Sequence, residues 1–296
     1  MQQPAIMRKT SHGTNWTTPE SELFAERAVA INGPINAETA MAAILQLRYL
    51  GRSSDDPVTL LINSPGGSVS DAMAVIDFMC GMRSPIRTHA LGVAASMAVV
   101  EVNASMGRIV AAPTAGASGI LPGVLLTLAK TRGWDDDALL RSLLTAGAIG
   151  MLIACGASIS GAEGGCQAET GTGAAMAAGS LVELSGGTPS QVLHAAAIAL
   201  KNVMGLVCDP VAGLVECPCI KRNALGAANA ILSADLALAG IESLIPFDEV
   251  VSAMKSVGRA MSPDLRETAR GGIAATPTGK ALQRALFGQE EEPERI

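Results

Sequence analysis

The feature of this sequence that most constrains its fold is the point at which strand-forming segments stop. Between residues 22 and 98, short runs rich in β-forming residues alternate with segments of helical pattern. Residues 28–31 and 58–62 are predicted strands, and residues 37–50 and 71–81 are predicted helices. After Val100 no comparable strand pattern follows. We therefore expect an α/β front segment with a parallel sheet, joined to a mostly α-helical domain.

Capping residues predict where individual helices begin and end. Asn36 is a favourable N-cap for the first of the two front helices, and Gly51 is its predicted end. Thr188 and Pro189 form an N-cap and first-turn pair, which predicts a helix that runs to about Met204 before Gly205. A further helix is predicted over residues 134–145, because its acidic start suits a helix N-terminus.

Composition limits the kind of core and the kind of partner. Aromatic residues make up only 2% of the chain while hydrophobic residues make up 49%, so the core has to consist of Ala, Leu, Ile, Val and Met. The 32 glycines indicate close helix packing. The net charge is −6 and no basic stripe is present, which argues against a nucleic-acid partner.

One stretch is long enough to cross a membrane. Residues 142–162 contain no charged side chain. They are rich in Gly, Ser, Ala and Thr, and they lack flanking aromatic anchors. A buried helix followed by a Gly/Ser loop is therefore predicted in place of a membrane span. The first residues show no apolar signal-peptide region, so a cytoplasmic location is expected.

Three of the six cysteines have a spacing that permits metal chemistry. Cys166, Cys208 and Cys219 lie 42 and 11 positions apart, each in a Gly- or Pro-containing segment. Three thiolates from distant loops can bind three corners of a 4Fe–4S cluster and leave the fourth iron open. Buried cysteine also serves as a small hydrophobic residue, so spacing alone leaves both interpretations open. Cys217 competes with Cys219 for the third position, and Cys80 and Cys155 are expected to be buried thiols.

The sequence motifs around these cysteines resemble the α chain of the bacterial iron–sulfur L-serine dehydratases over residues 98–288. The matching stretches are EVNASMGRIVAAPTAG (101–116), ASISGAEGGCQAE (157–169), GGTPSQ (186–191), IALKNVMGLVCDPVAGLVE (198–216), PCIKRNALGAANAI (218–231) and LRETARGGIAATPTG (265–279). The resemblance implies an L-serine ammonia-lyase that forms pyruvate and ammonia with a 4Fe–4S cluster as Lewis acid. It implies Cys166, Cys208 and Cys219 as ligands, a separate β chain as partner, and an oligomer.

Other residues in these words are candidates for substrate binding. Asn103, Ser105, Thr114 and Ser118 lie in Gly-rich words that suit carboxylate binding, or else they cap loops and helices. Lys201, Lys221 and Arg222 could bind a carboxylate or balance thiolate charge, and they could equally be surface cations. His194 lies among alanines within a predicted helix and is expected to be structural. No general base is identified.

Residues 21–97 resemble a different family, the proteolytic subunit of the Clp peptidase. The matching words are ELFAERAVAINGPIN (22–36), LLINSPGGSVSDAMAVIDFM (60–79) and GVAASMA (92–98). The resemblance implies truncated Clp/crotonase-like βα units, with Ser96 as nucleophile and Gly67 and Met97 as oxyanion-hole residues. The family's downstream His and Asp are missing, since His89 precedes Ser96 and His194 lies in the dehydratase-like part. A serine without a base is a poor nucleophile.

The two resemblances meet between Ala95 and Val100 and predict a chimera. Its parts are a polar N-terminal tail (1–20), the Clp-like segment (21–97), the dehydratase-like helical domain (98–288) and an acidic tail (289–296). The favoured function is L-serine dehydration, with activity reduced because a peptidase-like segment replaces the front of the dehydratase. The alternatives are a Clp-type peptidase subunit, or its inactive paralogue, and a non-catalytic fusion.

Overall fold

The computed structural model describes residues 6–288 except 11–12, 65–66, 85 and 88–89, and it divides into two units. The front unit covers residues 1–90 and the rear unit residues 91–296. The division therefore falls seven residues before the predicted boundary at residue 97. His12, His89 and the predicted acidic tail lie outside the described residues.

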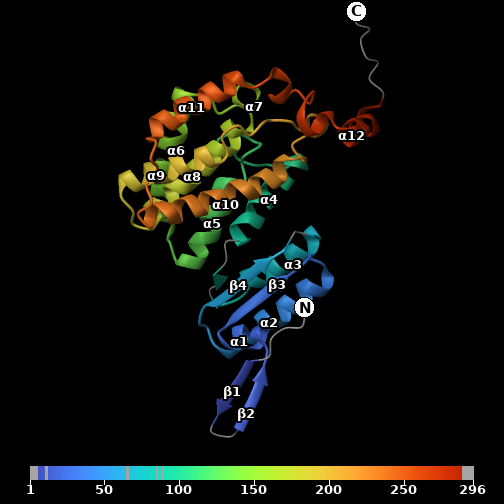
Figure 1. Cartoon of the computed structure of the whole chain (residues 1–296), viewed down its shortest axis with the longest axis vertical. Coiled ribbons are helices and arrows are strands. Elements are labelled where there is room, and N and C mark those ends of the chain that lie inside the picture. The colour runs from blue at the N-terminus through green and yellow to red at the C-terminus, as the bar shows by residue number, and fades with distance from the viewer. Residues whose placement is uncertain (1–5, 11–12, 65–66, 85, 88–89, 289–296) are drawn as a thin grey trace, which may run out of the picture. The chain divides into compact units, whose positions relative to one another are not determined.

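The front unit contains the predicted βα units (Figure 1). Its elements are β1 (Ile6–Thr10), β2 (Gly13–Thr17), α1 (Pro19–Ala25), β3 (Ala28–Asn32), α2 (Ala37–Ser53), β4 (Val58–Asn63), α3 (Val69–Cys80) and β5 (Ile86–Arg87). The strands β3, β4 and β5 form a parallel sheet in that order, as expected. Within the predicted polar tail, the described strands β1 and β2 pair as an antiparallel hairpin with Ile6 opposite Thr17.

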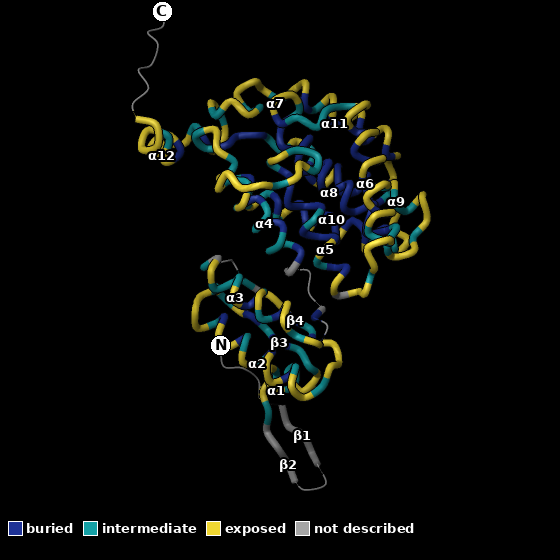
Figure 2. The backbone as a smooth tube through the Cα atoms, turned by 180° about the vertical axis from the view of Figure 1, so that it is seen from behind, coloured by how far each residue is buried: buried dark blue, intermediate teal, exposed yellow. Residues whose placement is uncertain are grey.

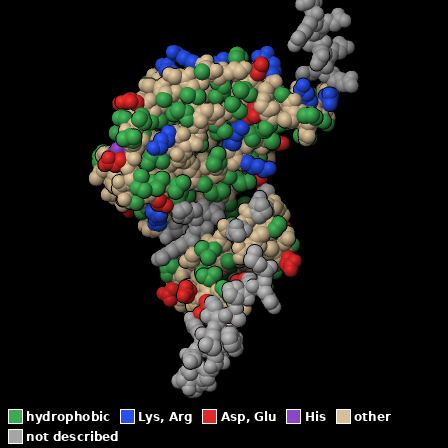
Figure 3. Space-filling view, viewed as in Figure 1, with side chains coloured by type: hydrophobic (Ala, Val, Ile, Leu, Met, Phe, Trp, Pro, Cys, Tyr) green, Lys and Arg blue, Asp and Glu red, His purple; other side chains and the backbone are tan. Residues whose placement is uncertain are grey.

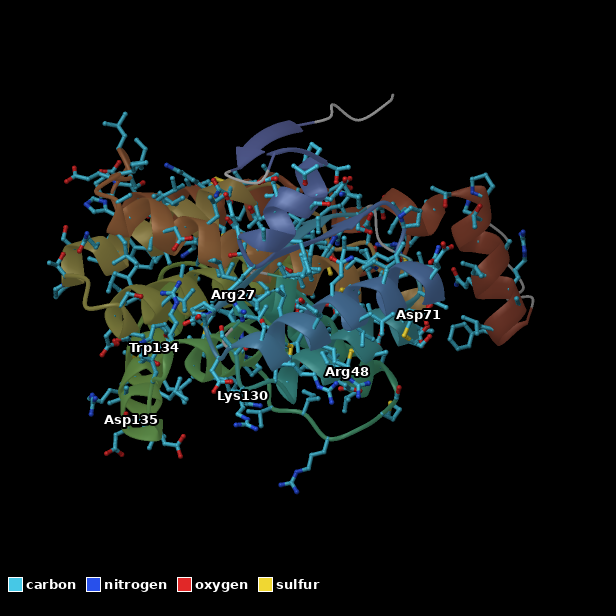
Figure 4. The ribbon with its side chains drawn as sticks, turned by 90° about the horizontal axis from the view of Figure 1, so that it is seen from below. Arg27, Arg48, Asp71, Lys130, Trp134 and Asp135 are labelled. Carbon is cyan, nitrogen blue, oxygen red and sulfur yellow. The ribbon has the colours of Figure 1, made fainter. Side chains whose placement is uncertain are left out.

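The helix α2 shows a cap that was predicted and an end that was not. Asn36 accepts hydrogen bonds from the backbone of Glu38 and Thr39, and this capping box fixes the start. The helix continues through Gly51 to Ser53. Arg27 explains the extension, because its guanidinium donates to the Leu50 carbonyl at 3.2 Å and to the Ser53 hydroxyl at 3.1 Å. Figure 4 labels this arginine, whose contacts with the last turn outweigh the local tendency of glycine to end a helix.

The rear unit is helical, and no strand occurs among the described residues after Arg87. Its helices are α4 (Ala90–Ala104, which starts at the unit boundary), α5 (Ile120–Arg132), α6 (Asp136–Gly156), α7 (Gly161–Gly164), α8 (Cys166–Leu184), α9 (Pro189–Asn202), α10 (Cys219–Leu238), α11 (Phe247–Ala260) and α12 (Pro277–Phe287). Three short 3₁₀ helices, η1 (Val211–Gly213), η2 (Pro263–Leu265) and η3 (Gly272–Ala275), lie in the connections. The mostly helical domain predicted from the sequence is confirmed.

The helix α8 is the centre of this unit. Every residue from Cys166 to Val182 is buried, and α5, α6, α9 and α10 pack around it (Figures 1 and 2). Small side chains permit this approach: an added Cβ at Gly179 would clash with Ile149 of α6, and one at Gly226 of α10 would clash with Ile120 of α5. The close packing expected from the glycine content is therefore present between the core helices.

The helix α6 is longer and more exposed than predicted. It begins after Asp135, whose carboxylate accepts from the Ala138 amide at 2.8 Å, and it runs eleven residues beyond the predicted end at Thr145 (Figure 4). Among the described residues it alone is long and apolar enough to cross a membrane, by length and composition. The prediction of a buried helix is correct for only one face: Ile149 and Ile153 are buried, whereas Leu144 is 75% exposed.

Substitutions on the two faces of α6 should therefore differ sharply. Replacing the fully buried Ile153 by alanine leaves a cavity and should lower the free energy of unfolding by about 2–5 kcal/mol. Leu144→Ala on the same helix removes an exposed side chain and should change it by less than about 0.5 kcal/mol. Urea denaturation followed by circular dichroism measures both values. Equal losses would show that the outer face of α6 is covered in solution.

Candidate functional site

The three spaced cysteines converge in the rear unit. Cys166 is the first residue of α8, Cys219 is the first residue of α10, and Cys208 lies in the connection between α9 and η1. All three are free thiols, and none is more than 5% exposed. Cys208 and Cys219 line the same cavity, and Cys166 lies near enough to raise the pKa of both thiols, so the three residues are called here the thiol cluster.

Backbone pairing fixes Cys208. Its amide donates to the Leu265 carbonyl at 2.8 Å, and its carbonyl accepts from the Glu267 amide at 2.7 Å. The two bonds form a parallel β-bridge between Cys208 and Arg266. The position of this sulfur therefore depends on a segment almost 60 residues further along the chain.

Buried amide side chains fix the other two cysteines. Gln167, next to Cys166, accepts from the Gly205 amide at 2.9 Å and donates to the Met254 carbonyl at 3.1 Å. Asn223 donates to the carbonyls of Cys219 and Gly116 and accepts from the Gly119 amide. Each cysteine thus lies at a helix start that is tied to a neighbouring element.

A cavity of about 340 Å³ opens beside the thiol cluster. Two of the three cysteines, Cys208 and Cys219, line it, together with two carboxylates and several small or apolar residues. The full lining is Thr114, Ala115, Gly116, Ile159, Ser160, Gly161, Glu169, Cys208, Pro210, Gly213, Val215, Cys219 and Glu267. This volume lies within the range typical of small-molecule sites, at its lower end.

The two carboxylates in the cavity wall were missed in the sequence analysis. Glu169 is 9% exposed and accepts from the Thr114 hydroxyl at 2.7 Å and from the Cys208 thiol at 3.8 Å. Burial raises its pKa, and the charge of Glu267 acts in the same direction. Glu169 follows Cys166 by three positions on one helix, a spacing that places both on one face and could have identified it. No local signal relates Glu267 to either of them.

Burial also determines the state of the three thiols. It raises the pKa of Cys166 and Cys208, and it raises the pKa of Cys219 to about 12. In the absence of metal they are therefore protonated and weakly nucleophilic, and metal binding has to release their protons.

An ion pair braces the loop that carries Cys208. Arg222 donates to the Asp209 carboxylate and to the Val207 carbonyl, at 2.8 and 2.7 Å. Asp209 also accepts from the Ile273 amide at 2.8 Å. Lys201 and Lys221 are exposed, so only Arg222 of the three cations named in the sequence analysis contacts this region.

Of the four predicted substrate-binding residues, one lines the cavity. Thr114 does so and orients Glu169. Asn103 makes only a long bond, 3.4 Å, to the carbonyl of Ala115, and Ser105 is exposed. Ser118 is fully buried, and its hydroxyl has no hydrogen-bond partner in the described part of the chain.

The remaining cysteines lie elsewhere. Cys217 is exposed and does not line the cavity, whereas its competitor Cys219 does. Cys80 and Cys155 are exposed, so the prediction that they are buried is wrong. Cys80 ends α3 and Cys155 lies on the outer face of α6, which the core does not cover.

The described residues contain no group of three or more His, Cys, Asp or Glu side chains arranged to hold a single metal ion. An iron–sulfur cluster makes a different demand, since each thiolate binds its own iron atom and the sulfur atoms need not converge on one point. Three buried thiols with a cavity beside them fit that demand.

Ser96 has no features of a nucleophile. It is fully buried in α4, and its hydroxyl donates to the Val93 carbonyl at 2.7 Å. Gly123 of α5 packs directly on it. Met97 belongs to the rear unit and Gly67, at a φ of 156°, to the front unit. His194 accepts from the Ser243 amide at 3.2 Å and so joins α9 to the segment before α11, as a structural histidine does.

Comparison with known proteins gives one consistent result. The family model described as "Serine dehydratase alpha chain" matches residues 25–274. The chain is 51% identical over 250 residues to the "Probable L-serine dehydratase, alpha chain" of Bacillus subtilis (strain 168), covering 84% of this chain and 81% of that protein. It is 56% identical over 195 residues to the corresponding protein of Latilactobacillus sakei, covering 66% and 93%. It is 55% identical over 195 residues to the "L-serine dehydratase, alpha chain" of Peptoniphilus asaccharolyticus, covering 66% and 67%.

The start of the family match bears on the front segment. Because the match begins at residue 25, it includes nearly all of the segment that resembles the Clp peptidase. The chimera predicted from residues 21–97 is therefore not supported, and neither alternative built on it, a peptidase subunit or a non-catalytic fusion, is favoured.

The burial of the thiols predicts which cysteines react. In metal-free native protein, iodoacetamide should modify Cys80, Cys155 and Cys217 and spare Cys166, Cys208 and Cys219, since the latter are buried and protonated. After denaturation all six should react. Peptide mass spectrometry reads the pattern. Rapid modification of the three buried cysteines in the native protein would contradict the described burial.

Proposed function

We propose that this chain, which belongs to the serine dehydratase alpha chain family, is an L-serine ammonia-lyase that converts L-serine to pyruvate and ammonia. The observation that carries the proposal is the thiol cluster, in which three thiols from separate segments are buried and two of them, Cys208 and Cys219, line a small cavity. The same lining supplies the carboxylates of Glu169 and Glu267 and the Thr114 hydroxyl, groups that an amino-acid substrate needs.

We further propose that Cys166, Cys208 and Cys219 hold a 4Fe–4S cluster. Three thiols fit the three protein ligands of such a cluster, and the absence of a side chain at Gly161 keeps the adjoining space open, since a Cβ there would lie 2.9 Å from the Cys208 sulfur. When bound, the cluster supplies an iron with an open coordination position, which acts as a Lewis acid towards the hydroxyl that leaves the substrate.

The residues of the cavity wall suit the remaining groups of serine. A serine molecule carries an ammonium group, and this group can donate hydrogen bonds to the carboxylates of Glu169 and Glu267. The Thr114 hydroxyl holds Glu169 in one orientation through its 2.7 Å bond. Ile159, Pro210 and Val215 add apolar surface, which limits water around the reacting atoms.

A second chain completes the proposal. The relatives are named alpha chains, from which we infer a β chain as partner. Thiol ligands and an exposed iron require a reducing environment, so we infer a cytoplasmic location. The reason given above for reduced activity, a foreign front segment, no longer applies, because the family match includes that segment.

Iron content tests the ligand assignment. Protein purified without oxygen should contain iron and absorb visible light, and Cys166→Ser, Cys208→Ser and Cys219→Ser should each lose most of both. Cys217→Ser is the matched control, since it removes an exposed thiol two positions from a proposed ligand and should retain the iron. Full iron retention by the three single variants would rule out these ligands.

Steady-state kinetics tests the substrate site. With an added β chain, Thr114→Val should lower kcat/KM for pyruvate formation about tenfold to a hundredfold, because a hydrogen bond to a charged group contributes about 1.5–3 kcal/mol. Its iron content should stay unchanged. Ser105→Ala, an exposed hydroxyl outside the cavity, should keep full activity. Unchanged kcat/KM in Thr114→Val would show that the orientation of Glu169 does not matter for turnover.

A further inference from the structure

A second cavity, of about 370 Å³, lies on the other side of the wall that carries the thiol cluster. Neighbouring residues face the two cavities in turn: Ala168 lines the second cavity and Glu169 the first, and Arg266 lines the second and Glu267 the first. The two cavities are therefore separate sites that share a wall formed by the start of α8 and the segment after η2.

Three cations surround the second cavity. Lys255 and Arg259 lie one turn apart on α11, and Arg266 enters from the segment after η2. In an acidic chain this is an unusual concentration, and Figure 3 shows Lys and Arg side chains along the edge of the molecule where α7 and α11 lie. None of the three takes part in an ion pair with a described residue.

The hydrogen bonding of Arg266 is incomplete. Its Nε is buried and has no partner in the described part of the chain, and its terminal nitrogen reaches the Glu163 carbonyl only at 3.5 Å. A buried donor without a partner is costly, which indicates that a ligand or solvent satisfies it.

The one carboxylate in the lining does not neutralise the cations. Glu163 accepts from the Ser158 hydroxyl at 2.7 Å and forms no ion pair with them. Three positive charges and one negative charge leave the lining with a net charge of +2. A ligand that matches it carries two negative charges.

We propose that this cavity is a binding site for a small phosphate-bearing metabolite. A phosphate monoester carries a charge of about −1.5 to −2 at neutral pH and offers three acceptor oxygens. Two guanidinium groups supply the forked donors that match such oxygens, and Lys255 adds a point charge. The volume admits a small metabolite and lies near the lower limit for ligand cavities, which disfavours a nucleotide.

Calorimetry on the full chain tests the proposal, with inorganic phosphate as the probe at constant ionic strength. Phosphate should bind, and it should raise the melting temperature because it binds only the folded state. Succinate tests a dianion of another class, and acetate tests a monoanion. Phosphate should bind more tightly than either.

Variants locate the site. Arg266→Gln should weaken phosphate binding about tenfold, which corresponds to about 1.4 kcal/mol. The double variant Lys255→Gln/Arg259→Gln changes exposed side chains only, and it should weaken binding at least as much even if Arg266→Gln does not fold. Arg270→Gln is the matched control, because Arg270 is exposed, pairs with Asp264 and lies outside the cavity. It should bind phosphate like the unmodified chain.

Several results would overturn the proposal. These are the absence of phosphate binding, equal affinity in the double variant and the unmodified chain, or an equal loss in Arg270→Gln. Tighter binding of succinate or acetate would reject a phosphate ligand. Because binding is measured without turnover or iron, the result is independent of the proposed dehydratase activity.

Discussion

The structure of the rear unit depends on the burial of one helix, α8, over almost its whole length. From Cys166 to Val182 every residue of α8 is buried, so four other helices have to pack directly against its backbone. Glycine and alanine make that approach possible, at a cost of up to about 1 kcal/mol of helix propensity for each glycine. The same burial forces the polar start of α8 to find partners. Gln167 obtains a partner from Gly205 and Glu169 one from Thr114, and the segment of Thr114 thereby forms part of the cavity wall.

Features that depend on neighbours in sequence were predictable. The caps at Asn36 and Thr188 belong to this class. Features that depend on distant residues were not. The extension of α2 past Gly51 depends on Arg27, and the pairing of two carboxylates in one cavity joins residues almost 100 positions apart. The exposure of Cys155 depends on where the core ends, which periodicity alone does not indicate.

Ser96 illustrates the limit of a short sequence resemblance. Its surrounding word matches a peptidase nucleophile, yet a nucleophile needs an accessible hydroxyl and a base. Here the hydroxyl donates to the carbonyl of Val93, and Gly119 and Gly123, at the start of α5, pack against the serine backbone. The small residues of the motif at 92–98 serve helix packing, so the motif resembles that of the peptidase without its chemistry.

The β-bridge at Cys208 has a consequence for the order in which the protein is made. The bridge partner is Arg266, and the brace on Asp209 comes from Ile273, so the loop that holds Cys208 is incomplete until both have left the ribosome. A nascent chain that ends between Cys219 and Arg266 contains Cys166, Cys208 and Cys219 but lacks the bridge partner that fixes Cys208. For the proposed metal site, the consequence is that the backbone position of Cys208 becomes complete only after nearly the whole chain has been synthesised.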